Sequence, residues 1–121
     1  MQKILVADDE TDLRNLLADE LSYAGFWVKS VSNGADAVVA VVEENFDLVL
    51  LDMMMPQMDG MQTIRVLRKL KPNLPILGLT GYVGRGYMAE AAMYGVTCLS
   101  KPIDIPELLQ IVDDALLAPK F

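Results

Sequence analysis

Residues 47–60 read DLVLLDMMMPQMDG, and this stretch decides the fold. Residues 48–51 form an unbroken apolar run, which is typical of a strand buried on both faces of a parallel sheet. The run ends in a carboxylate, Asp52. Burying an ionised carboxylate without a partner is costly, so Asp52 needs a cation or a basic side chain beside it. The stretch therefore predicts a central strand that ends in a functional site.

Short apolar runs alternate with helical patterns along the rest of the chain. The second run, WVKSV, alternates apolar and polar residues, which predicts a half-exposed edge strand. Alternating strands and helices predict an α/β fold, a flavodoxin-like doubly wound parallel sheet of five strands in the order 2-1-3-4-5 with five helices. The expected strands are residues 3–7, 27–31, 48–51, 75–80 and 96–100.

Capping residues and apolar spacing locate the helices between these strands. Asn33 and Asp59 are expected to cap the second and third helices, and Asp104 with Glu107 the fifth. Apolar residues at helical spacing predict the buried faces, among them Val42 in the second helix and Leu70 in the third.

Composition limits the class of protein. The 121 residues, 53% of them hydrophobic, suit one domain spanning residues 1–121. A net charge of −7 argues against direct nucleic-acid binding by this domain. The only cysteine, Cys98, excludes an internal disulfide and is expected to be a buried structural thiol. With no apolar span near the roughly 18 residues of a membrane helix and no signal peptide, a cytoplasmic location without membrane contact is expected.

Polar residues follow four of the expected strands. In a doubly wound sheet, ligands bind beyond the carboxyl ends of the strands, where the strand order reverses. Clustered carboxylates are relieved there by a hard divalent cation such as Mg2+, and a lysine and a threonine can bind phosphoryl oxygens. The residues that converge at this edge are Asp8, Asp9, Asp52, Thr80 and Lys101.

Four motifs in order resemble the receiver domain of two-component response regulators of the chemotaxis-regulator type: VADDE at 6–10, LLDMMMPQMDG at 50–60, LT at 79–80 and LSKP at 99–102. The resemblance implies a phosphorylation-dependent signalling switch. It implies that Asp52 accepts a phosphoryl group from a histidine kinase or histidine phosphotransfer protein, because this chain has no histidine. It also implies self-catalysed phosphotransfer and autodephosphorylation only, with no enzymatic turnover.

The same resemblance implies roles for the other site residues. Asp9 is the direct Mg2+ ligand, Asp8 acts through water, and Asp52 and the Met54 carbonyl complete the metal site. Lys101, often preceding a cis proline bond in this family, and Thr80 contact the phosphoryl group, and the N–H of Gly81 is open to it. The switch would act on a downstream protein or a fused output domain, as a monomer or a phosphorylation-dependent dimer.

This sequence departs from the family pattern at the position three residues before the lysine. The family has Tyr or Phe there, whereas this chain has Cys98, with Tyr82 and Tyr94 as candidate substitutes. Met54 and Tyr82 occupy the positions that in the family flank the path of the hydrolysing water. Two bulky groups there predict slow loss of the phosphoryl group.

Other interpretations of the same residues stay open. Asp8 and Asp9 could cap the first helix, and the methionines at 53–55 are expected to fill loop and core space. A degenerate receiver would bind partners only. A Mg2+-dependent phosphohydrolase with an aspartyl nucleophile is disfavoured by Met54, where such enzymes have a second acid. The glycines at 81, 84 and 86 lack the lysine of a phosphate-binding loop.

Overall fold

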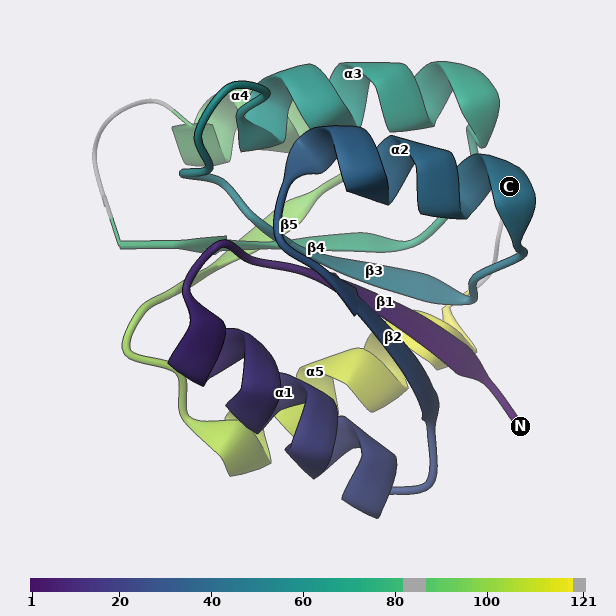
Figure 1. Ribbon diagram of the computed structural model, residues 1–121, viewed down its shortest axis with the longest axis vertical. Helices are drawn as coiled ribbons and strands as arrows, with labels where there is room; N and C mark the ends of the chain where they lie inside the picture. The colour runs from purple at the N-terminus through teal and green to yellow at the C-terminus, as the bar shows by residue number, and fades with distance from the viewer. Residues whose placement is uncertain (82–86, 119–121) are drawn as a thin grey trace.

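The computed structural model describes residues 1–81 and 87–118, except for the side chain of Tyr87. Within these residues the strands form one parallel sheet in the order β2-β1-β3-β4-β5 (Figure 1). This order confirms the predicted doubly wound topology, with the half-exposed strand at one edge. The strands are β1 (Lys3–Ala7), β2 (Trp27–Val31), β3 (Leu48–Asp52), β4 (Ile76–Thr80) and β5 (Thr97–Ser100).

Helices cover both faces of the sheet. Figure 1 shows α1 and α5 on one face, and α2, α3 and α4 on the other. A separate core of buried apolar side chains lies on each face. Among the helices described, none combines the length and apolar character needed to cross a bilayer. The helices are α1 (Thr11–Tyr23), α2 (Gly34–Glu43), α3 (Gly60–Leu70), α4 (Tyr87–Met93) and α5 (Ile105–Leu117).

Two of the three predicted helix caps form. The side chain of Asn33 accepts the N–H of Asp36, and Asp59 forms a capping box with Gln62 at the start of α3. Asp104 occupies the predicted cap position of α5, which confirms the helix start, but its side chain makes no capping hydrogen bond. A proline in the first turn supplies helical backbone angles without such a bond.

The buried face of α2 differs from the prediction. Val42 is 65% exposed, whereas Ala37, Ala40 and Val41 are buried. Residues 37, 40 and 41 share the buried face of α2, and at about 100° per residue Val42 lies beside that face and turns toward solvent. Leu70, at the end of α3, is likewise 43% exposed.

The register of the central strands determines where the acids lie. Ala7 of β1 pairs with Leu51 of β3, so the next residues, Asp8 and Asp52, lie side by side at the carboxyl ends of these strands. The loop after β3 folds back onto the strand end. The N–H of Gly60 donates to the carbonyl of Met53 at 3.2 Å, and a Cβ on Gly60 would lie 2.5 Å from the Cα of Met53. Only glycine allows this close approach, which holds the backbone next to Asp52.

Candidate functional site

Three aspartates gather at the carboxyl ends of β1 and β3. One carboxylate oxygen from each of Asp8, Asp9 and Asp52 lies within 4.8 Å of the others. Asp8 and Asp52 are buried, and Asp9 is exposed to solvent. Three like charges this close repel one another unless a proton or a cation compensates them.

The oxygens of this cluster fit a hard cation. Oδ1 of Asp8 accepts the backbone N–H of Glu10 at 2.9 Å. Its other oxygen, Oδ2, is buried and accepts no hydrogen bond from any residue that the structure describes. Buried carboxylate oxygens in folded proteins almost always have a partner. A set of carboxylate oxygens with one unsatisfied buried member is the ligand chemistry that Mg2+ prefers.

The surroundings of Asp52 make its carboxyl group harder to ionise than an ordinary aspartate. Burial raises the pKa of Asp52 to about 7, opposed by a hydrogen bond from the N–H of Met54. That N–H lies 3.1 Å from Oδ1 of Asp52. Asp8 raises the pKa further, Lys101 lowers it and Asp9 raises it. A cation in the cluster would favour the ionised carboxylate and so reverse this shift.

Lys101 lies beside three carboxyl groups of the site. Its Nζ is 3.5 Å from Oδ1 of Asp52, 3.6 Å from Oδ2 of Asp8 and 3.7 Å from Oε2 of Glu10. Burial opposes the charged form, but Asp52, Asp8 and Glu10 together hold the pKa of Lys101 above its usual range. The lysine precedes a cis peptide bond to Pro102, as the family resemblance implies.

Thr80 and Gly81 end the neighbouring strand. Thr80 is fully buried at the end of β4, and its carbonyl accepts the N–H of Lys101 at 2.8 Å. Gly81 is exposed, and apart from its chain neighbours no atom of the described residues lies within 4 Å of the position that a Cβ would take.

Two further residues, for which the sequence predicted no role, contact the site. Glu10 pairs with Lys101, and Nη1 of Arg14 donates to the carbonyl of Asp8 at 2.8 Å. Glu10 directly follows the two aspartates in VADDE, and this position in the motif could have indicated that it lies at the site. No sequence pattern indicated Arg14, because its contact depends on the turn between β1 and α1. Asp8 and Asp9 do not cap α1, because Glu10 occupies that position.

Cys98 lies in the interior, as expected for a structural thiol. It is buried in β5, and burial raises the pKa of its thiol. A Cβ added at Gly78 would come within 2.7 Å of its sulfur, so the two strands pack tightly here. Tyr94 packs against the same core, whereas Tyr82 lies outside the described residues.

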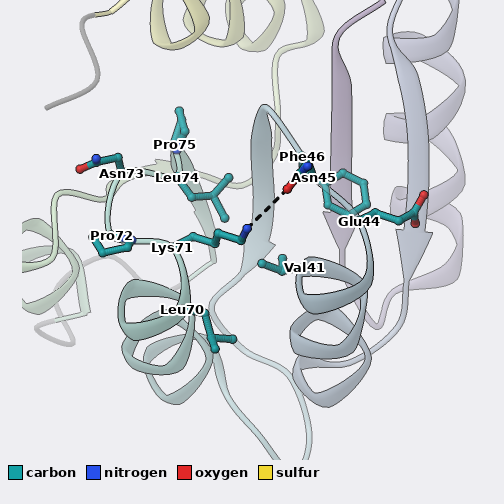
Figure 2. Close-up of a pocket in the computed structure, with 10 residues that line it drawn as sticks. All are labelled: Val41, Glu44, Asn45, Phe46, Leu70, Lys71, Pro72, Asn73, Leu74 and Pro75. Atoms are coloured by element: carbon teal, nitrogen blue, oxygen red, sulfur yellow. Dashed lines mark hydrogen bonds between the residues drawn. The ribbon is translucent and has the colours of Figure 1, made fainter.

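A cavity of about 260 Å³ lies away from the acids, at the amino ends of β3 and β4 (Figure 2). Residues 44–46 and 70–75 line it, and Nζ of Lys71 lies 3.4 Å from Oδ1 of Asn45. None of the clustered aspartates contributes to this cavity. It is therefore separate from the charged site at the carboxyl ends of the strands.

Comparison with known proteins places this chain among response regulator receiver domains. The family model described as the response regulator receiver domain matches residues 4–113. The response regulator receiver protein CpdR of Brucella abortus is 34% identical over 119 residues, covering 98% of this chain and 99% of that protein.

Another relative is much longer than this chain. The transcriptional regulatory protein GlrR of Escherichia coli is 35% identical, with 93% of this chain covering 26% of that protein. Among solved structures, the response regulator TrrA of Thermotoga maritima, in complex with Mg(2+)-BeF, superposes with a TM-score of 0.86 at 31% identity. That match covers 95% of this chain and 99% of TrrA.

Proposed function

This chain belongs to the receiver domains of two-component response regulators, which are phosphoacceptors, and we propose that Asp52 is its phosphorylated residue. The observation that carries the proposal is the position of Asp52. It is a buried carboxylate, grouped with two other acids, with an ammonium 3.5 Å from its Oδ1. We propose residues 1–121 as one such domain.

The proposed reaction is a single phosphoryl transfer. A carboxylate oxygen of Asp52 forms a bond to phosphorus as the phosphorus–nitrogen bond of a partner's phosphohistidine breaks. The released imidazole takes up a proton from solvent, and Asp52 becomes an acyl phosphate. Such transfers are accelerated by positioning and by charge neutralisation rather than by covalent chemistry elsewhere in the site.

The neighbouring residues supply both effects. Asp9 directly, Asp8 through water, and Asp52 with the Met54 carbonyl would hold Mg2+. When bound, that ion neutralises charge on the transferring group. Lys101 would neutralise one phosphoryl oxygen, and the hydroxyl of Thr80 would donate to a second. The N–H of Gly81 would be open to the phosphoryl group.

The donor would be a cytoplasmic histidine kinase or histidine phosphotransfer protein. We propose that phosphorylation changes the surface that a downstream protein or a fused output domain contacts, as a population shift between two conformations. The quarter of GlrR that this chain matches supports the fused arrangement. We propose a monomer that either remains monomeric or dimerises on phosphorylation.

Intact-mass spectrometry after incubation with acetyl phosphate tests the proposal. We expect wild-type protein to gain one phosphoryl group with Mg2+ and none with a chelator, because the clustered acids repel an anionic donor unless a cation neutralises them. If neither acetyl phosphate nor a phosphohistidine protein modifies it, the chain is a degenerate receiver that binds partners only. Sustained hydrolysis of a generic phosphate ester would instead indicate a phosphohydrolase.

Met54 is expected to slow loss of the phosphoryl group. Met54 is 41% exposed, and its backbone N–H donates to Oδ1 of Asp52, so this residue lies next to the carboxylate that would carry the phosphoryl group. We expect Met54→Ala to shorten the lifetime of phosphorylated protein about threefold to tenfold, equivalent to roughly 1 kcal/mol of barrier. The decay of the phosphorylated mass over time measures it. Met93→Ala, which truncates an 84% exposed methionine of α4, should leave the lifetime unchanged.

A lifetime of seconds for the wild-type acyl phosphate would contradict this role of Met54. So would equal lifetimes for wild type and Met54→Ala.

A further inference from the structure

Lys101 is shared among three carboxylates rather than committed to one. Its distances to Asp52, Asp8 and Glu10 are 3.5, 3.6 and 3.7 Å, all longer than the about 3 Å of an ordinary hydrogen bond. The lysine side chain is 21% exposed. Small differences in attraction therefore decide which carboxylate holds the ammonium.

Glu10 differs from the other two carboxylates. Asp8 and Asp52 belong to the aspartate cluster and are buried, whereas the side chain of Glu10 is 61% exposed and lies outside that cluster. Glu10 occupies the cap position of α1, yet its side chain makes no capping hydrogen bond. Its backbone is held by the bond to Asp8, and its carboxylate pairs with Lys101 instead.

Occupancy of the cluster by a cation would change this balance. The cation offsets part of the negative charge of Asp8 and Asp52, so the attraction of Glu10 for Lys101 grows relative to theirs. A phosphoryl group on Asp52 needs the same ammonium. Contact between Lys101 and that group therefore competes with the Glu10 ion pair.

We propose that Glu10 is a positioning residue of this site, with two opposing effects. Its charge strengthens Mg2+ binding, and its hold on Lys101 slows phosphoryl transfer to Asp52. The inference rests on the proposed function of Asp52. Because the ion pair is largely exposed, each effect should amount to about twofold to fivefold.

Three variants separate the ion pair from the charge. Glu10→Gln removes the charge, and Glu10→Asp keeps it but withdraws the carboxylate from Lys101 by about one carbon–carbon bond. Asp12→Asn removes an exposed charge from the same first turn of α1. Titration calorimetry with Mg2+ alone measures metal affinity. The initial rate of phosphorylation by acetyl phosphate at saturating Mg2+ measures transfer.

We expect Glu10→Gln to weaken Mg2+ binding about twofold to fivefold while raising the phosphorylation rate by a similar factor. Glu10→Asp should raise the rate equally but bind Mg2+ like wild type. Asp12→Asn should leave the rate unchanged, which excludes general repulsion of the anionic donor as the cause. A role limited to folding would lower the Mg2+ affinity and the phosphorylation rate together rather than move them in opposite directions.

Two results would overturn the inference while leaving the proposed function intact. One is a wild type that is phosphorylated no more slowly than Glu10→Gln. The other is a phosphorylation rate of Glu10→Asp equal to that of wild type. The charge of residue 10, and not its ion pair with Lys101, would then set the rate. A wild type that takes up no phosphoryl group from any donor would overturn both this inference and the proposed function.

Discussion

Asp52→Asn is expected to take up no phosphoryl group. The amide has nearly the shape of the carboxylate, and its oxygen can still accept the Met54 N–H that lies 3.1 Å from Oδ1 in the wild type. It lacks the anionic oxygen that attacks phosphorus, so the rate should fall by at least about a hundredfold. Intact mass after incubation with acetyl phosphate and Mg2+ measures the loss.

Asp19→Asn is the matched control for this variant. Asp19 is an exposed aspartate of α1, and its replacement makes the same chemical change away from the cluster. It should be phosphorylated like wild type. If Asp52→Asn also gained a phosphoryl group at the wild-type rate, another side chain would be the acceptor.

The second prediction concerns stability and pH. The pKa of Asp52 is about 7 in the folded protein against an ordinary value of 3.8, mainly because of burial. Between these values the folded protein keeps a proton that the unfolded chain has lost, so the free energy of unfolding falls as pH rises. Without Mg2+, wild type should lose about 2 to 3 kcal/mol relative to Asp52→Asn between about pH 5 and pH 8.

Chemical denaturation of both proteins across this pH range measures the difference. The comparison with Asp52→Asn removes the contribution of the other carboxylates, and Asp19→Asn should follow wild type. Saturating Mg2+ should abolish most of the trend, because the cation binds the ionised carboxylate. A constant difference between wild type and Asp52→Asn from pH 5 to pH 8 would contradict a raised pKa.

Much of the fold was predictable because its signals are local. The apolar run at 48–51 is a buried strand, the alternating run at 27–31 is the edge strand, and Asp59 caps its helix. Helix orientation was less predictable: periodicity alone favoured Val42 as a buried residue. Its 65% exposure depends on how α2 is rotated against the sheet, with Ala37, Ala40 and Val41 inward, and apolar spacing alone did not settle that rotation.

The pattern of strands was enough to predict that Asp8, Asp9, Asp52 and Lys101 meet at one edge, because parallel strands bring their carboxyl ends together whatever packs around them. How Lys101 is shared among the carboxyl groups depends on the packing of distant segments. Its neighbour Glu10 lies about ninety positions away along the chain. The unsatisfied oxygen of Asp8 and the raised pKa of Asp52 likewise arise from burial and from distances of a few ångströms. Such quantities depend on side-chain packing across the sheet, whereas sequence patterns encode only periodicity and order.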